Sequence, residues 1–254
     1  MRVTLFDYGA GNLHSLAKAL SEASDPVRIE PDPVRALDTD LLVLPGVGAF
    51  ASAAERLAPG RAEMRAAIEA GLPCLGICLG MQLLFEASEE GPGEGLGIFR
   101  GRVTRLKAER VPQIGWNTLE PVRGRGSARA LSPAGWASRP DALLEHAPLD
   151  FVYYAHSFVC RPEDPGMVIA WSTHETDRFA AAIRRGGVLG VQFHPEKSSR
   201  AGVRLVRAFL DEARAGRAPG GTMLASCQDI EPAAPLGAAR RTAARLGPGA
   251  MPCW

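Results

Sequence analysis

The segment LGICLGMQ (residues 75–82) places Cys78 between two glycines, where an apolar run meets an amphipathic stretch. The run predicts a short buried strand, and MQLLFEAS (residues 81–88) predicts the start of a helix. Gly76 and Gly80 permit the strand and helix to approach closely around a strained turn, the thiol version of the nucleophile elbow. We therefore expect the Cys78 sulfur to project from the edge of a sheet toward solvent.

Short apolar runs alternate with helical patterns on the amino-terminal side of this segment. VTLF (residues 3–6) and LLVLP (residues 41–45) predict strands, and LHSLAKALSEA (residues 13–23) and RAEMRAAIEAG (residues 61–71) have helical periodicity. Such alternation predicts an α/β domain whose parallel sheet is covered by helices on both faces.

The pattern changes after residue 97. Strand-like segments follow one another with few helical stretches between them, which predicts an antiparallel section: GIFRGRVTRL, GWNTLE, DFVYYAHSFVC, GMVIAWST and RFAAAIRRGGVLGVQFH. A helical pattern at residues 202–216 closes the fold. Residues 121–140 predict an irregular insertion, and the Ala-, Pro-, Gly- and Arg-rich residues 218–254 predict a disordered tail. One domain is therefore expected over residues 1–214.

Composition narrows the possible classes of protein. The chain has 254 residues, 46% of them hydrophobic, and a net charge of +1 without clustered basic residues, so nucleic-acid binding is not expected. It lacks a run of roughly 18 apolar residues and an apolar signal-peptide core, so no membrane association is expected. Five scattered cysteines without a CxxC pair predict no metal site. We expect reduced thiols, no cofactor and a cytoplasmic protein.

A histidine and a carboxylate lie two residues apart in LGVQFHPEK (residues 189–197), at the end of an apolar run. Residues two apart on a strand point to the same face, so His194 and Glu196 can act together. The imidazole would take the proton of the Cys78 thiol, and the carboxylate would fix the imidazole tautomer. The thiolate is the reactive form of cysteine, so these residues predict a catalytic triad.

Isolated cysteines and histidines are more often structural. We assign that role to Cys74 and Cys160, and we place His174 in a hairpin because its neighbour Glu175 would point away from it.

LPGVG (residues 44–48) follows the third predicted strand, at a position where α/β sheets place ligand sites. The glycines are consistent with a simple tight turn, but they also permit a backbone N–H to turn toward an anion. The amides of Val47 and Leu79 are therefore candidate oxyanion donors.

Together, GICLGMQ and HPE resemble the motifs of the class I, or triad, glutamine amidotransferases. Within that family the glutaminase subunits of imidazole glycerol phosphate synthases are most similar, through DYGAGN, LPGVGAF, PQIGWN, YYAHSF and QFHPEKS. The resemblance covers residue 1 to about residue 212. It implies a three-layer α/β/α, flavodoxin-like fold with a mixed sheet.

The resemblance also implies hydrolysis of glutamine to glutamate and ammonia. The residues implied to bind glutamine are Gly46, Gln82, Glu90, His156, Ser157 and Phe158. The implied partner is a (β/α)₈-barrel cyclase subunit, joined as a heterodimer, which uses the ammonia to make imidazole glycerol phosphate and aminoimidazole carboxamide ribotide in histidine biosynthesis. The residues implied at the interface are Asn12, Trp116, Tyr153 and Lys197.

Several alternatives stay open at this point. Trp116 is as well explained by a place in the core as by an interface. The chain is also compatible with the glutaminase subunit of another amidotransferase, an inactive scaffold, or another cysteine hydrolase with the same elbow. Gln82 and PGVGAF favour a small amino acid as the ligand. Gly46 and Gly48 further suggest that the oxyanion peptide is misoriented in the isolated chain and turns into place only when the partner binds nucleotide.

Overall fold

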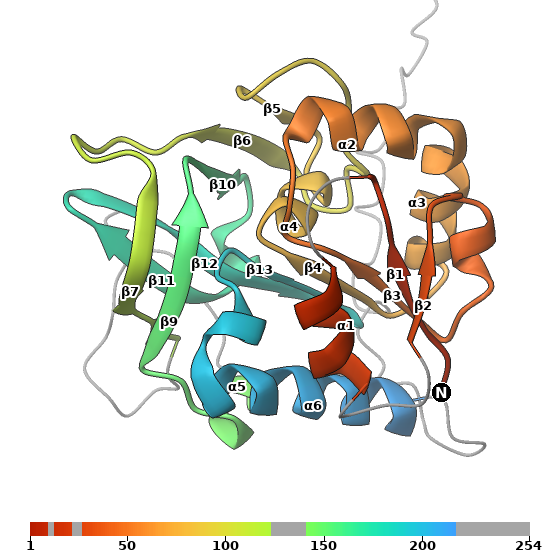
Figure 1. Cartoon of the computed structure of the whole chain (residues 1–254). Coiled ribbons are helices and arrows are strands. Elements are labelled where there is room, and N and C mark those ends of the chain that lie inside the picture. The colour runs from red at the N-terminus through yellow and green to blue at the C-terminus, as the bar shows by residue number, and fades with distance from the viewer. Residues whose placement is uncertain (10–12, 22–26, 123–140, 217–254) are drawn as a thin grey trace, which may run out of the picture. The chain divides into compact units, whose positions relative to one another are not determined.

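An eight-stranded mixed sheet lies between two layers of helices (Figure 1). The computed structural model describes residues 1–9, 13–21, 27–122 and 141–216, all within one unit, Met1–Thr222. In sheet order, the strands are β2 (Val27–Glu30), β1 (Val3–Phe6), β3 (Leu41–Leu44), β4 (Cys74–Ile77), β13 (Val188–Val191), β12 (Asp177–Arg185), β11 (Val168–His174) and β8 (Glu120–Pro121). The predicted α/β class with a mixed sheet is confirmed.

Strands β2, β1, β3, β4 and β13 are parallel, and β12, β11 and β8 continue the sheet antiparallel. The antiparallel section predicted after residue 97 is present, but one of its strands, Val188–Val191, also pairs in parallel with β4. A turn through Gly186, with φ +55°, reverses the chain after β12. Strand β13 therefore returns antiparallel to β12, which makes it parallel to β4.

The central strands β1, β3, β4 and β13 are apolar on both faces because each face supports a separate core. In β3, Leu41 and Val43 belong to one core, and Leu42 and Leu44 belong to the other. Helices α1 (His14–Ser21), α5 (Ala142–His146) and α6 (Ser199–Ala215) contribute to the first core. Helices α2 (Phe50–Leu57) and α3 (Arg61–Glu69) contribute to the second. The two-residue period of a strand thus explains why continuous apolar runs form the centre of this fold.

Two smaller sheets flank the large one. A three-stranded sheet contains β10 (Phe158–Pro162), β6 (Gly101–Arg105) and β5 (Ala87–Ser88), and a ribbon pairs β7 (Gln113–Thr118) with β9 (Phe151–His156). The predicted insertion falls between β8 and α5, where residues 123–140 lie outside the described part of the chain. The predicted tail also lies outside it.

Helix α4 (Leu79–Leu83) is shorter than the amphipathic stretch to residue 88 predicts. The carbonyl oxygens of Leu83 and Phe85 accept hydrogen bonds from the N–H groups of Leu96 and Gly97, respectively. A returning loop thus takes acceptors that a longer helix would use. Gly95 permits this approach, because a Cβ there would lie 2.1 Å from the Phe85 carbonyl oxygen.

Candidate active site

A pocket of about 270 Å³ lies at the carboxyl ends of the parallel strands, beside the β7–β9 ribbon. Its walls come from segments that are far apart in the sequence and that meet because β3 and β4 are neighbours. The lining residues are Gly46, Gly48, Cys78, Leu79, Gln82, Glu90, Pro112, Ile114, Ala155, His156, Ser157 and Phe158. Most of the predicted catalytic and glutamine-binding residues are therefore neighbours in space.

Cys78 occupies a strained turn between β4 and α4, with φ +46° and ψ −103°. A positive φ is uncommon for a residue with a side chain, and strained backbone conformations cluster at active sites. Gly80 permits the start of α4 to pack closely against β3, because a Cβ there would lie 2.0 Å from the Leu44 carbonyl oxygen. The strained strand–turn–helix predicted from the sequence is present, although Cys78 is buried at the wall of the pocket.

His194 and Glu196 form a buried hydrogen-bonded pair, with Nδ1 of His194 2.8 Å from Oε1 of Glu196. Burial alone would lower the pKa of His194, but hydrogen bonds to Cys78 and Glu196 raise it to about 10. The geometry therefore favours an imidazolium beside the sulfur, which is the state that follows proton transfer from the thiol.

The backbone of His194 is held on both sides. Its N–H donates to the Tyr153 carbonyl oxygen at 2.8 Å, and its own carbonyl oxygen accepts from the Ser198 hydroxyl at 2.7 Å. The Ser198 hydroxyl oxygen in turn accepts from the Tyr153 N–H at 2.9 Å. The backbone of His194 is thus fixed relative to strand β9.

The loop after β3 closely approaches the side chains of both His194 and Cys78. A Cβ at Gly46 would lie 2.9 Å from Cε1 of His194 and 3.0 Å from Cβ of Cys78, so only glycine fits. The Tyr8 hydroxyl donates a hydrogen bond to the Pro45 carbonyl oxygen and anchors the start of this loop. Of the two predicted oxyanion residues, Leu79 lines the pocket, whereas Val47 is half-buried, packs against a core and is not part of the lining.

Two predicted glutamine-binding residues have defined partners near the pocket. Nε2 of Gln82 donates to the Phe158 carbonyl oxygen at 3.0 Å. The Glu90 carboxylate accepts from the Phe50 N–H at 2.9 Å, which ties the turn after β5 to the start of α2. Because α4 ends at Leu83, Gln82 and Glu90 do not share one helix, yet both line the pocket.

His156 lies on the inward face of β9. Its Nδ1 is 3.0 Å from the Phe158 carbonyl oxygen, and burial lowers its pKa to about 4. At neutral pH it is therefore an uncharged part of the pocket wall.

Gln192 is a buried polar residue of the site that sequence reasoning missed. Its Nε2 lies 3.5 Å from Sγ of Cys78, and its Oε1 lies 3.5 Å from Nε2 of Gln82. One signal was available, because Gln192 stands two residues before His194 at the end of the same strand.

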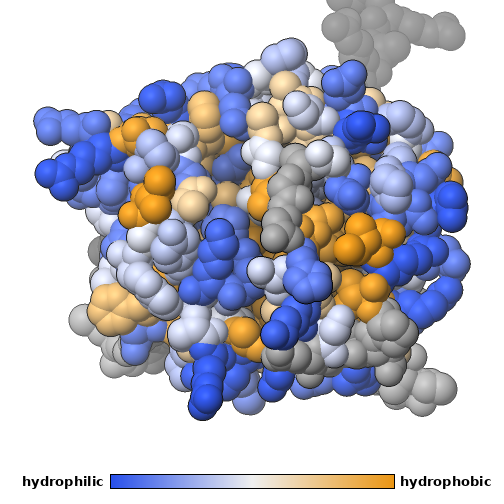
Figure 2. Space-filling view, in the orientation of Figure 1, coloured by the Kyte–Doolittle hydropathy of each residue, from blue (hydrophilic) through white to orange (hydrophobic). Residues whose placement is uncertain are grey.

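The outward face of the β7–β9 ribbon carries large apolar side chains. Ile114, Trp116 and Phe151 are 67%, 55% and 59% exposed. The Trp116 and Tyr153 rings meet edge to face, and Nζ of Lys197 is 5.7 Å from the Tyr153 ring centroid. Figure 2 shows hydrophobic colouring interrupting the hydrophilic surface on the side where Figure 1 places this ribbon.

This exposure excludes the core position for Trp116, and a contiguous exposed apolar patch is typical of an interaction surface. The face is continuous with the pocket, because Ile114 also lines it. Asn12, the remaining residue predicted at the interface, lies outside the described residues.

Among the described residues, no group of three or more His, Cys, Asp or Glu side chains is arranged to hold a metal ion. The helices of this part of the chain are too short or too polar to cross a membrane. Cys74 and Cys160 are fully buried free thiols, as the sequence predicts, and burial raises the pKa of each.

Comparison with known proteins agrees with this geometry. The family "Glutamine amidotransferase class-I" matches residues 4–213. The imidazole glycerol phosphate synthase subunit HisH of Synechococcus sp. (strain JA-3-3Ab) is 42% identical over 216 residues, covering 83% of this chain and 94% of the relative. The protein of the same name from Pyrococcus furiosus is 41% identical over 212 residues, covering 82% of this chain and 97% of the relative.

Solved structures support the fold. A putative GMP synthase component from Thermoplasma acidophilum superposes with a TM-score of 0.62 at 18% identity, covering 85% of this chain and 96% of that one. At this identity the likeness shows a shared architecture and says nothing of the substrate.

Proposed function

The chain belongs to the class-I glutamine amidotransferase family, and from this premise we propose that it hydrolyses glutamine to glutamate and ammonia. The ammonia passes to a cyclase subunit that makes imidazole glycerol phosphate and aminoimidazole carboxamide ribotide in histidine biosynthesis. The observation that carries the proposal is the placement of the Cys78 thiol beside the His194–Glu196 pair at the wall of a pocket.

In the proposed mechanism, Sγ of Cys78 attacks the side-chain carbonyl carbon of glutamine. His194 takes the thiol proton and returns it to the leaving ammonia, while Glu196 holds the imidazole through Nδ1. The N–H groups of Leu79 and Val47 stabilise the oxyanion. The product is a glutamyl thioester, which water hydrolyses with His194 as the general base.

Glutamine binding is assigned to the rest of the pocket. Because the Gln82 amide donates both of its hydrogen bonds from Nε2, its Oε1 remains available to accept from the α-ammonium group of the substrate. The residues proposed to contact glutamine are Gly46, Gln82, Glu90, His156, Ser157 and Phe158.

The named relatives are subunits of a synthase, so a partner subunit is part of the proposal. We assign the outward face of the β7–β9 ribbon to a (β/α)₈-barrel cyclase in a cytoplasmic heterodimer, because its exposed aromatic residues suit a binding hot spot. Trp116, Tyr153 and Lys197 lie on or against this face, and Asn12 is proposed to join them. The amidotransferase domain is assigned to residues 1–214.

A further part of the proposal concerns the oxyanion loop. Val47 lies outside the pocket lining, which supports a peptide that turns inward only when the partner is bound. The chain alone would then show little steady-state glutaminase activity. Appreciable activity of the purified chain without a partner contradicts this part.

The main experiment mixes the chain with the candidate cyclase and measures glutamine-dependent turnover of the nucleotide substrate. We expect turnover by the wild-type chain and its loss in Cys78→Ser, with ammonium salts still supporting the cyclase. Cys160→Ser, which alters a buried thiol in β10, is the matched control and is expected to retain glutamine-dependent turnover. An unreduced rate with Cys78→Ser disproves the assignment of the nucleophile.

A further inference from the structure

Gln192 lies beside Cys78 because of the register of two parallel strands. Val191 pairs with Ile77, and the Cys78 N–H donates to the Val191 carbonyl oxygen at 2.7 Å. The residues that follow each pair, Gln192 and Cys78, are therefore held side by side at the carboxyl edge of the sheet. The side chain of Gln192 is fully buried, and its Nε2 lies 3.5 Å from Sγ of Cys78.

Hydrogen-bond chemistry fixes which end of the Gln192 amide faces the sulfur. The Phe158 carbonyl oxygen only accepts, so the amide of Gln82 must direct its NH₂ group toward it. The same NH₂ group faces Gln192, which must therefore present Oε1. The NH₂ group of Gln192 is then left pointing at Cys78, where it acts as a donor to sulfur.

The ionisable groups that interact with the sulfur come from several elements. His194, supported by Glu196, follows β13, Tyr8 follows β1, and Cys160 lies on β10. Glu90 faces the same pocket. Burial raises the pKa values of Tyr8 and Cys160 well above their ordinary values, so both stay uncharged near neutral pH. Among these groups, His194 donates to sulfur only in its protonated form, whereas the amide of Gln192 is a donor at every pH.

We propose that Gln192 is a positioning residue that stabilises the thiolate of Cys78 through its side-chain N–H and holds it in line with the pocket. The inference rests on the proposed role of Cys78 as nucleophile and extends it. When water adds to the thioester, the C–S bond breaks and its electron pair returns to sulfur, while His194 takes the proton of water. The N–H of Gln192 then stabilises the leaving thiolate as it stabilised the attacking one.

The test measures alkylation of Cys78 by iodoacetamide in the purified full chain, from pH 5 to pH 9.5, with the modified peptide quantified by mass spectrometry. Gln192→Met removes the amide at similar length. We expect alkylation about tenfold slower at pH 6, because a hydrogen bond to a charged group is lost. The rate profile should move to higher pH by about one unit and should converge with that of the wild type at the alkaline end.

Gln113→Met is the matched control, because Gln113 is also a buried glutamine but lies on β7, which belongs to a different sheet from β4 and β13, the strands that precede Cys78 and Gln192. Its profile should superimpose on that of the wild type. General damage to the fold would lower the alkylation rate at every pH. Loss of thiolate stabilisation would lower it mainly at pH values below the midpoint of the rate profile.

A second variant keeps the test decisive if Gln192→Met fails to fold, as checked by circular dichroism. Gln192→Asn retains an amide that is one methylene too short to reach the sulfur, and it should shift the profile in the same direction. The inference is overturned if the profile of a folded Gln192 variant matches the wild type, or if Gln113→Met shifts equally. The assay contains no glutamine, so failure of the proposed glutaminase function would be seen separately, in the turnover experiment.

Discussion

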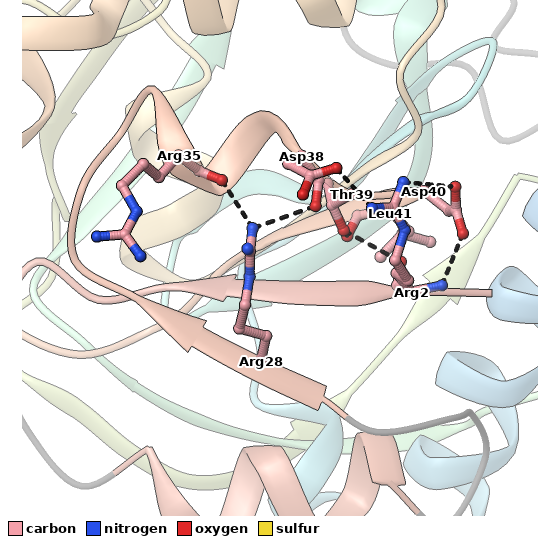
Figure 3. A network of polar contacts seen from close by, with 7 residues as sticks. All are labelled: Arg2, Arg28, Arg35, Asp38, Thr39, Asp40 and Leu41. Carbon is pink, nitrogen blue, oxygen red and sulfur yellow. Dashed lines mark hydrogen bonds and ion pairs between the residues drawn. The ribbon is translucent and has the colours of Figure 1, made fainter.

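Polar groups lie at both the amino ends and the carboxyl ends of the parallel strands, but they are arranged differently at the two ends. At the amino ends, polar groups pair with one another (Figure 3). Nη1 of Arg2 donates to Asp38 at 2.5 Å, the Arg2 N–H donates to Asp40 at 2.7 Å, and the Thr39 hydroxyl donates to the Arg2 and Leu41 carbonyl oxygens. Hydrogen-bonding groups at this end are used within the chain and leave little for a ligand.

At the carboxyl ends, by contrast, polar groups face a pocket, and glycines stand where side chains would fill it. Gly46 leaves room for His194 and Cys78 to approach each other. The difference indicates that changes at the amino ends should cost stability and leave chemistry intact, whereas changes at the carboxyl ends should cost chemistry first. Four predictions test this contrast.

The largest effect is expected for His194→Ala at the carboxyl ends. Loss of a positioned acid–base group should reduce glutamine-dependent turnover in the presence of the partner by roughly 10²- to 10⁴-fold. His146→Ala, which removes an exposed histidine on α5, should leave turnover unchanged. Equal turnover in the two variants contradicts the assignment of His194.

The second prediction concerns stability and pH at the pocket wall. Burial lowers the pKa of His156 from 6.5 to about 4, so the unfolded chain binds a proton at a higher pH than the folded chain. The contribution of His156 to the free energy of unfolding should therefore be full above pH 6.5 and fall by up to roughly 3 kcal/mol as the pH drops to about 4. Urea titrations across this pH range measure the free energy of unfolding.

The variant His156→Leu isolates this contribution, because it should lose the part of the pH dependence due to His156. His194 contributes a dependence of the opposite sign, because its raised pKa makes its contribution fall as the pH rises from about 6.5 to about 10. Both proteins share this contribution, so comparing them at each pH removes it. An unchanged slope of unfolding free energy against pH in His156→Leu argues against a neutral buried imidazole.

The same substitution at the two ends of the strands gives the third prediction. Gly46→Ala at the carboxyl end should reduce glutamine-dependent turnover about 100-fold, because the new Cβ displaces His194 or Cys78. Gly187→Ala at the amino end of β13 should have little effect, because the nearest atom to its Cβ is 3.6 Å away. Comparable turnover rates for Gly46→Ala and Gly187→Ala would contradict the proposed difference between the two ends of the strands.

The smallest effect is expected at the amino ends. Thr39→Val removes a hydroxyl that donates at 3.0 Å and 2.9 Å to two carbonyl oxygens, and it should lower the free energy of unfolding by about 1 kcal/mol. Cys78 alkylation and turnover should not change. Asp38→Asn, which weakens an exposed ion pair with Arg2, should have a still smaller effect that disappears at high salt. A loss of turnover in either variant contradicts the separation of the two ends.

Strand positions could be predicted from local patterns because each central strand is apolar on both faces and bounded by turn residues. The length of α4 could not, because its end depends on a loop from residues 95–99 that takes its carbonyl acceptors. The direction of β13 likewise depends on which strand it joins, and periodicity carries no information on pairing partners.

By itself, the sequence determined the elbow around Cys78, the proximity of His194 to Glu196 and the family, because these depend on short spacings in the chain. The tertiary structure alone decided that Gln192 reaches the sulfur and that Trp116 is exposed. It also decided that Gly46 leaves room for two reactive side chains to approach each other. Each of these facts depends on residues that are distant in sequence and are brought together by strand order, which local chemistry does not encode.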